Sequence, residues 1–335
     1  MWYRILLNRL ILAAVTLAGV AVIVFVLVRV VPGDPVAMMI APGASDADIQ
    51  ALRARYGLDL PIFQQFVVWM KGILAGDFGT SFSLRQDVVS LVLGRLPATL
   101  ELAGLALFIA VILGVEVAVI AALAGGTWFE SLLQNINGLA LAVPDFIWAL
   151  LFVLVLGVLW PVLPVSGRVD PRLDLGLVTD FYLIESLVTG RFRLAGHLLT
   201  HMLMPAMALA LPLSAIITRV MMGTLREAML QDYVLLARIK GFSRFRIVMQ
   251  EALRNALVPV LSLTGVQFTF LVGGTVIVER IFSYPGIGNM AIDAVINRDL
   301  PLIQGLVLTF GVLFILINLA VDMLTTLLNP RLRHG

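Results

Sequence analysis

Residues 233–278 read YVLLARIKGFSRFRIVMQEALRNALVPVLSLTGVQFTFLVGGTVIV, and the two parts of this stretch differ in charge. The part up to Arg254 contains five lysines and arginines and a single acid, Glu251. The residues that follow, 255–278, contain no charged side chain. A helix that crosses a membrane needs about 20 mostly apolar residues. The stretch therefore predicts a membrane-spanning helix that begins directly after a basic segment.

The composition of the whole chain is that of a membrane protein. Of its 335 residues, 60% are hydrophobic and 13% are charged, and the mean hydropathy is +1.02. Soluble domains have about 25% charged residues. Cysteine is absent, which excludes disulfides, thiolate metal sites and cysteine nucleophiles. The net charge of +2 gives no indication of a nucleic-acid partner.

Six stretches are long and apolar enough to span a membrane, which predicts an all-α integral membrane protein with six transmembrane helices. These stretches lie near residues 10–31, 97–124, 131–160, 198–222, 255–278 and 300–328. The first leads into VPGDP (31–35) and not into a cleavage site, so we expect an uncleaved span. Glu116 interrupts the second stretch and Asp145 the third.

The positions of Lys and Arg predict the orientation of these spans, because basic residues are enriched in cytoplasmic loops. Loop 223–254 has a net charge of +3, whereas loops 32–96, 161–197 and 279–299 sum to about −1, 0 and −1 by the same count. Arg4 and Arg9 precede the first span, and further arginines follow the last. We therefore expect both termini and loop 223–254 in the cytoplasm.

The predicted organisation has four parts. An N-terminal transmembrane helix (1–31) precedes an extracytoplasmic helical region (32–96), a transmembrane domain (97–328) that contains the cytoplasmic loop, and a cytoplasmic tail (329–335).

The outer loops carry their own helix signals. Ser45 with Asp48 resembles a capping box, and Gly57 is a plausible helix end. Residues 61–76 predict a short amphipathic helix that either lies on the membrane surface or caps the helix bundle. In loop 161–197 we expect Thr179 to cap a short helix that ends at Gly190.

The basic segment predicts two amphipathic helices that meet at Gly241. Leu225, Met229 and Leu236 fall at helical spacing before the glycine, and Ser243 can cap a second helix after it. One face of the second helix holds the apolar residues Phe245, Val248, Met249, Ala252 and Ala256, and another holds Arg246, Gln250 and Arg254. Attraction to anionic lipid is the simpler explanation of the charge. A corner with an apolar side, however, better fits a socket on a cytoplasmic protein.

Residues 233–259 resemble the cytoplasmic loop of permease subunits of binding-protein-dependent ABC importers, specifically the dipeptide/oligopeptide/nickel class. Further motifs that support the resemblance, to the B-type subunit, are VPGDP (31–35), YGLDLP (56–61), LPATLEL (96–102), PVSGR (164–168), HMLMPA (201–206), ERIFSYPGIG (279–288) and NLAVDMLTTLLNPRLRH (318–334). The chain departs from the general importer motif at Leu235 and Leu236, which stand where that motif has Glu and Ala.

The resemblance implies a type I importer permease in the bacterial inner membrane. Such a subunit would form half of the pathway for peptides and pair with a C-type permease, two cytoplasmic ATPases and an extracytoplasmic binding protein. Its loop would form a coupling helix that docks on an ATPase and links ATPase closure to alternating access. By the resemblance, docking falls to Ala237, Arg238, Lys240, Gly241, Phe242, Ser243 and Phe245.

The chain lacks the motifs of an enzyme. It contains no P-loop, no G-x-S-x-G elbow and no H-E-x-x-H helix, so ATP and Mg would bind the partner ATPases. His197 and His201 are four residues apart near several methionines, but packing explains them better than a metal site. A gradient-driven transporter remains the alternative, as do nickel-chelate or glutathione-like cargoes for an importer.

Three polar residues inside the predicted spans are candidates for the transport pathway. An ionisable side chain within a bilayer normally faces a partner or water. Asp145 meets this description, and Gln267 is a further candidate in the fifth span. Glu116 is either a second such residue or a carboxylate at the inner membrane interface. Asp145 follows Pro144, and we hypothesise that it lines the passage or pairs across a subunit interface, with Arg219 as one candidate partner.

Overall fold

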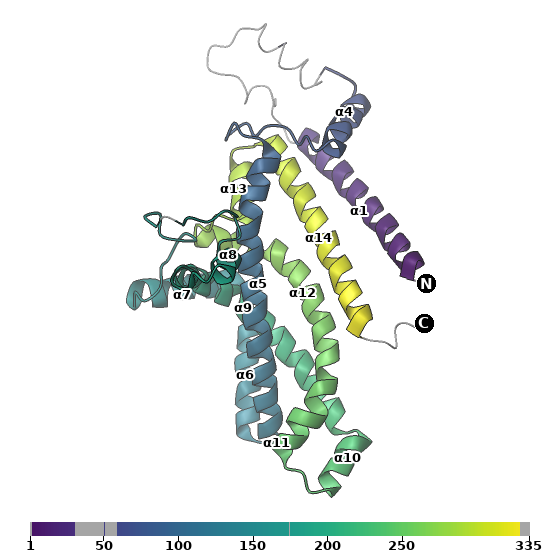
Figure 1. The fold of residues 1–335 in the computed structure, drawn as a ribbon, viewed down its shortest axis with the longest axis vertical. Helices are drawn as coiled ribbons and strands as arrows, with labels where there is room; N and C mark the ends of the chain where they lie inside the picture. Colours follow the sequence, from purple (N-terminus) through teal and green to yellow (C-terminus); the bar gives the residue numbers. More distant parts are fainter. Residues whose placement is uncertain (1, 31–49, 51–58, 174, 329–335) are drawn as a thin grey trace. The chain divides into compact units, whose positions relative to one another are not determined.

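The computed structural model describes residues 2–30, 50, 59–173 and 175–328. These residues form helices joined by loops (Figure 1), and in place of a sheet they contain one isolated bridge between Thr80 and Asp87. The chain divides into two compact units, Met1–Leu96 with Met290–Ile315 and Pro97–Asn289 with Leu316–Gly335. The all-α fold class is therefore confirmed.

The first unit contains α1 (Trp2–Val30), α4 (Ile62–Leu74) and the beginnings of α5 (Val88–Ala124) and α14 (Leu300–Leu328). The predicted amphipathic helix is α4. Its Phe66 and Trp69 rings lie 5.2 Å and 5.6 Å from the ring of Phe25 on α1. Because the opposite side chains, such as Phe63, are exposed, α4 has one packed face and one open apolar face.

A buried aspartate organises the loop before α5. Asp299 Oδ2 accepts hydrogen bonds from the hydroxyls of Ser81 and Ser83, both at 2.6 Å, and from the backbone N–H of Ser83. Burial works to raise the pKa of the Asp299 carboxyl, but these hydrogen bonds outweigh it and hold the pKa below its ordinary value.

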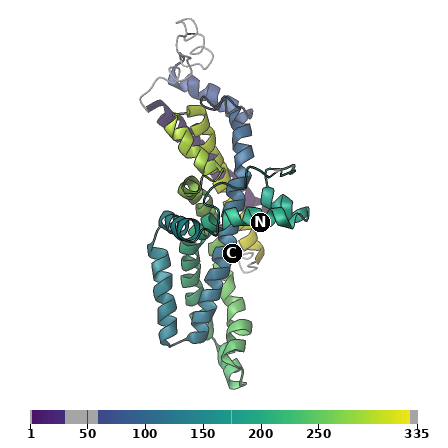
Figure 2. The same cartoon turned by 90° about the vertical axis from the view of Figure 1, so that its left-hand side faces the viewer.

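The second unit is built around α9 (Phe192–Met229). This helix packs against α6 (Trp128–Ala142), α7 (Asp145–Phe152), α8 (Tyr182–Val188) and α12 (Leu253–Ile281). Figure 2 shows α6 alongside α9. Between α9 and α12 lie α10 (Asp232–Ile239), α11 (Arg244–Arg246) and the π-helix η2 (Ile247–Ala252); a second π-helix, η1 (Val153–Leu159), follows α7. The short helix α13 is Ile287–Ile296.

Within the described residues, four helices are long and apolar enough to cross a membrane. These are Val88–Ala124, Phe192–Met229, Arg244–Ile281 and Leu300–Val321. The third predicted span is two helices, α6 and α7, that meet at a 99° bend. The bend follows from Pro144, which lacks a backbone N–H and holds Val143 in an extended conformation. In α1, Ile11–Val26 forms a shorter apolar helix.

The structure tests some of the expectations about local structure, and others concern residues that it does not describe. Glu116 does not interrupt its span, because its side chain is exposed on the surface of a continuous α5. Thr179 does not cap α8, because the N-cap of this helix is Phe181. The Thr179 hydroxyl instead donates a hydrogen bond to Glu185. Gly190 follows α8 with φ +70°, as expected for a helix end. Ser45, Asp48 and Gly57 lie outside the described residues.

Candidate functional site at the basic corner

The segment between α9 and α12, residues 230–252, is called the basic corner below. α9 ends at Met229, and Gln231 starts α10 with an extended backbone. Gly241 has φ +78°, a left-handed conformation that favours glycine, and Ser243 Oγ then accepts a hydrogen bond from the N–H of Arg246. The predicted turn at Gly241 and the predicted N-cap at Ser243 are both confirmed.

The helix before the glycine was predicted incorrectly as continuous. The chain turns at Leu230 and Gln231, so that Val234 and Ala237 of α10 face inward while Leu236 is half exposed. Val234, Ala237 and Ile247 form a small core, against which Met229 and Phe242 pack. This core fixes α10 to the start of η2.

The helix after the glycine also differs from the predicted face. Ile247, Val248 and Ala252 are buried, but Phe245 is 62% exposed and Met249 is 39% exposed. The reason is η2, whose π-helical turns are wider than the α-helical period used to assign that face. Arg246 and Gln250, which were predicted to share a face, form a hydrogen bond, with Nε donating to Oε1 at 3.1 Å.

The seven residues expected to dock an ATPase divide into two groups. Ala237 is buried and Phe242 packs on the core, with the Arg246 guanidinium 3.9 Å above its ring. The other five are exposed, namely Arg238, Lys240, Gly241, Ser243 and Phe245. Ala237 and Phe242 therefore shape the corner, with Phe242 half-buried, and the second group is the part of this set most open to another protein.

Sequence reasoning missed most of the apolar surface of the corner. Leu230 and Ile239 are 85% and 75% exposed, and Leu235 and Leu236 are more than half exposed. The sequence did indicate this surface, because positions 235, 236 and 239 are apolar and lie on the side of α10 opposite the buried Val234 and Ala237. The solvent-exposed face of the corner therefore consists of apolar side chains interspersed with basic ones.

The pathway candidates are not joined to one another by any hydrogen bond or ion pair of the described residues. Glu116 is exposed on α5, and Gln267 is half-buried on α12. Asp145 is half-buried, and its Oδ1 accepts the N–H of Phe146 at 2.7 Å in the first turn of α7. The described contacts do not pair it with Arg219, so the hypothesis of a contact across a subunit interface stays a prediction.

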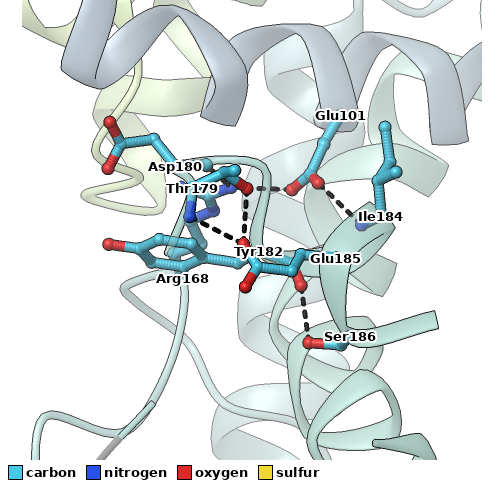
Figure 3. A network of polar contacts seen from close by, with 8 residues as sticks. All are labelled: Glu101, Arg168, Thr179, Asp180, Tyr182, Ile184, Glu185 and Ser186. Carbon is cyan, nitrogen blue, oxygen red and sulfur yellow. Dashed lines mark hydrogen bonds and ion pairs between the residues drawn. The ribbon is translucent and has the colours of Figure 1, made fainter. Parts of the chain in front are cut away.

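A network that the sequence did not indicate lies around the PVSGR segment (Figure 3). Arg168 Nη2 donates to Glu101 Oε2 on α5 and to the carbonyl of Asp180, both at 2.7 Å. The other oxygen of Glu101 accepts the N–H of Ile184, and the ring of Tyr182 lies 3.9 Å from the guanidinium. The ion pair is almost completely buried, and it fastens Arg168 to α5 and to Asp180, just before α8.

Glu185, on α8, binds the residues just before this helix. It accepts hydrogen bonds from the N–H groups of Val178 and Thr179 and from the Thr179 hydroxyl. The Thr179 hydroxyl, with these two backbone groups, lowers the pKa of the Glu185 carboxyl.

The ERIFSYPGIG segment is also tightly held. Glu279 accepts hydrogen bonds from the Thr99 hydroxyl at 2.7 Å and from the N–H of Asn289 at 2.9 Å. A Cβ at Gly286 would lie 2.3 Å from a Glu279 oxygen, which explains the glycine. Tyr284 is fully buried, and this burial raises the pKa of its hydroxyl.

His197 and His201, which the sequence places four residues apart, lie near the start of α9. His201 Nδ1 lies 3.1 Å from the carbonyl oxygen of Ser166, and His197 is exposed. The part of the chain that the structure describes contains no group of three or more His, Asp or Glu side chains placed to hold a metal ion.

Two family models match the chain. The model described as "Binding-protein-dependent transport system inner membrane component" covers residues 95–334, and a model of the N-terminal part of such components covers residues 2–103. The chain belongs to this family of permeases. The basic corner lies within the first match, as do the Glu101–Arg168 and Glu279 networks.

Curated relatives match this permease over their full length. A dipeptide transport system permease protein of Escherichia coli (strain K12) is 36% identical over 335 residues, 99% of each chain. A di/tripeptide transport system permease protein of Pseudomonas aeruginosa (strain UCBPP-PA14) is 38% identical over 328 residues, 98% of each chain. A putative peptide transport system permease protein of Brucella melitensis biotype 1 is 35% identical over 334 residues, 100% of each chain.

Proposed function

We propose that this permease forms half of the transport pathway of an ATP-driven peptide importer in a bacterial inner membrane. The observation that carries the proposal is full-length similarity to permeases that are named for dipeptide, di/tripeptide and peptide transport. The chain has no P-loop, so the energy would come from ATP and Mg bound to partner ATPases. No covalent chemistry on the peptide is required.

The assembly would contain a second, C-type permease, two ATPases and an extracytoplasmic binding protein. The basic corner supports an ATPase partner because its exposed face combines apolar side chains such as Ile239 with the cations Arg238 and Lys240. Apolar anchors surrounded by charges are typical of protein interfaces. The Val234–Ala237–Ile247 core would keep this face rigid while the ATPases move.

The first experiment is co-purification of the tagged permease with its ATPase from native membranes in mild detergent. The double variant Ile239→Asp with Lys240→Glu changes two exposed side chains and leaves the small core intact. We expect it to lose most of the ATPase, because it places two acids on the apolar, basic face. Val188→Asp is the matched control, since Val188 is exposed on α8, outside the corner.

Peptide uptake into reconstituted proteoliposomes tests the cargo. We expect dipeptide uptake to require ATP and the binding protein, and to fall with the Ile239→Asp, Lys240→Glu variant. Uptake driven by an ion gradient without ATP would contradict the proposal and support a secondary transporter. Competition by a nickel chelate or by glutathione, but not by dipeptides, would keep the importer and change its cargo.

A further inference from the structure

A hollow of about 360 Å³ opens where the turn between α5 and α6 meets the end of α9 and the basic corner. All of its lining residues belong to the second unit. The lining residues are Ala122, Gly125, Gly126, Glu130, Met222, Leu225, Arg226, Met229, Leu230, Arg238 and Arg244. The hollow thus combines apolar side chains with three arginines and a single carboxylate.

The arginines leave this hollow with a net positive charge. Arg226 pairs with Glu130 at 2.8 Å, which offsets one of the three charges. Arg244 Nη2 donates to the carbonyl of Ala122 at 2.8 Å, and this carbonyl carries no full charge. No hydrogen bond or ion pair of the described residues engages the Arg238 guanidinium. Each guanidinium has five N–H donors, so most donors remain for a ligand.

Two glycines shape the wall beside Arg244. A Cβ at Gly125 would lie 1.8 Å from Arg244 Nη2, so a larger residue would push the guanidinium off the turn. Gly126 has φ +82°, and its N–H donates to Glu130 at 2.7 Å. The same glycine turn therefore positions Arg244 and, through Glu130, Arg226.

Several guanidinium groups around an apolar hollow match one chemical class of ligand. The planar fork of arginine fits the oxygens of a phosphate with paired hydrogen bonds. Basic pockets between membrane helices on the cytoplasmic side bind phosphate-bearing lipid headgroups. The side chains of Met222, Leu225 and Met229 offer apolar surface to the part of a lipid next to its phosphate.

We propose that this hollow binds a phosphate group, carried either by an anionic phospholipid or by a soluble phosphate. The site overlaps the residues assigned to ATPase docking at Arg238 alone, and it lies at the edge of the basic corner. The choice of leaflet depends on the proposed orientation, whereas the chemistry of the site does not.

The test measures ligand binding to the purified full-length chain in neutral detergent. Native mass spectrometry reports retention of added phosphatidylglycerol or phosphatidylcholine, and thermal unfolding reports stabilisation by inorganic phosphate. Two variants, Arg238→Gln and Arg244→Gln, each remove one arginine from the hollow. Arg254→Gln is the matched control, because Arg254 is exposed in the same basic region and does not line the hollow.

We expect phosphatidylglycerol to be retained in preference to phosphatidylcholine, with about a tenfold loss in either hollow variant and no loss in the control. If inorganic phosphate instead displaces the lipid and stabilises only the chains with an intact hollow, the phosphate site stands and its ligand is soluble. Equal retention of both lipids without any effect of inorganic phosphate would overturn the proposal. An equal loss in the Arg254→Gln control would also overturn it.

Discussion

At the scale of single residues, Glu101 and Arg168 form a buried ion pair within the second unit. The two side chains are only 1% and 4% exposed, and Glu101 also holds the N–H of Ile184. Removal of one partner from a buried ion pair costs about 3–5 kcal/mol, because the other charge remains buried and unpaired. Replacement of both residues, Glu101→Gln with Arg168→Met, avoids that penalty. The glutamine carbonyl can still accept the N–H of Ile184, whereas the hydrogen bond from Arg168 to the Asp180 carbonyl is lost.

We therefore expect Arg168→Met alone to lower the thermal midpoint of the detergent-solubilised permease, and Glu101→Gln with Arg168→Met to recover part of the loss. Arg172→Met is the control, since Arg172 is exposed on the same loop. Thermal unfolding followed by tryptophan fluorescence measures these three variants and Glu101→Gln alone, which the comparison with additive losses requires. Strictly additive losses in the double variant would contradict a direct coupling between the two side chains.

At the scale of elements, α5 and α9 approach closely at Gly114. A Cβ there would lie 2.7 Å from Ile217 Cγ2 and 2.9 Å from the carbonyl oxygen of Ser214, and the Thr218 hydroxyl already donates to the Gly114 carbonyl. Small residues let membrane helices pack this closely. A side chain at position 114 must therefore separate the two helices.

We expect Gly114→Ala to lower the thermal midpoint and Gly114→Leu to abolish recovery of folded protein from membranes. Gly104→Ala is the matched control on the same helix, because nothing lies within 4 Å of its added Cβ. Since alanine favours a helix over glycine by about 1 kcal/mol, the control is expected to be neutral or stabilising. Size-exclusion chromatography with thermal unfolding distinguishes these outcomes, and equal effects at both positions would refute close packing at Gly114.

The elements also show what the sequence could and could not predict. Gly241 and Ser243 are local signals, so the corner was predicted correctly at both positions. Pro144 explains the break between α6 and α7, but a proline in the sequence does not give the 99° angle at which the two helices meet. The π-helical turns of η2 could not be predicted from the spacing of apolar residues, because that spacing was compared with the α-helical period only. Glu101 and Arg168 lie 67 residues apart, and no periodicity links residues at that separation.

At the scale of the whole molecule, the proposed importer needs a rigid link between ATPase docking and the spans. Gly241 lies between α10, which carries the exposed Arg238, and Ser243, which caps the helix leading into α12. Its φ of +78° suits glycine, whereas other residues pay about 1–2 kcal/mol for a left-handed conformation. An alanine at this position would therefore change the angle or firmness of the link without removing a docking side chain.

We expect Gly241→Ala to reduce peptide uptake several-fold more than it reduces ATP hydrolysis by the reconstituted importer, because docking persists while transmission weakens. Gly190→Ala is the matched control, since Gly190 has a similar φ of +70° but follows α8, outside the basic corner. Both variants carry the same kind of backbone strain, so a difference between them reports position and not stability. Parallel assays of peptide uptake and phosphate release give the ratio of transport to hydrolysis. An unchanged ratio in Gly241→Ala, or an equal change in the control, would mean that this turn does not transmit the motion.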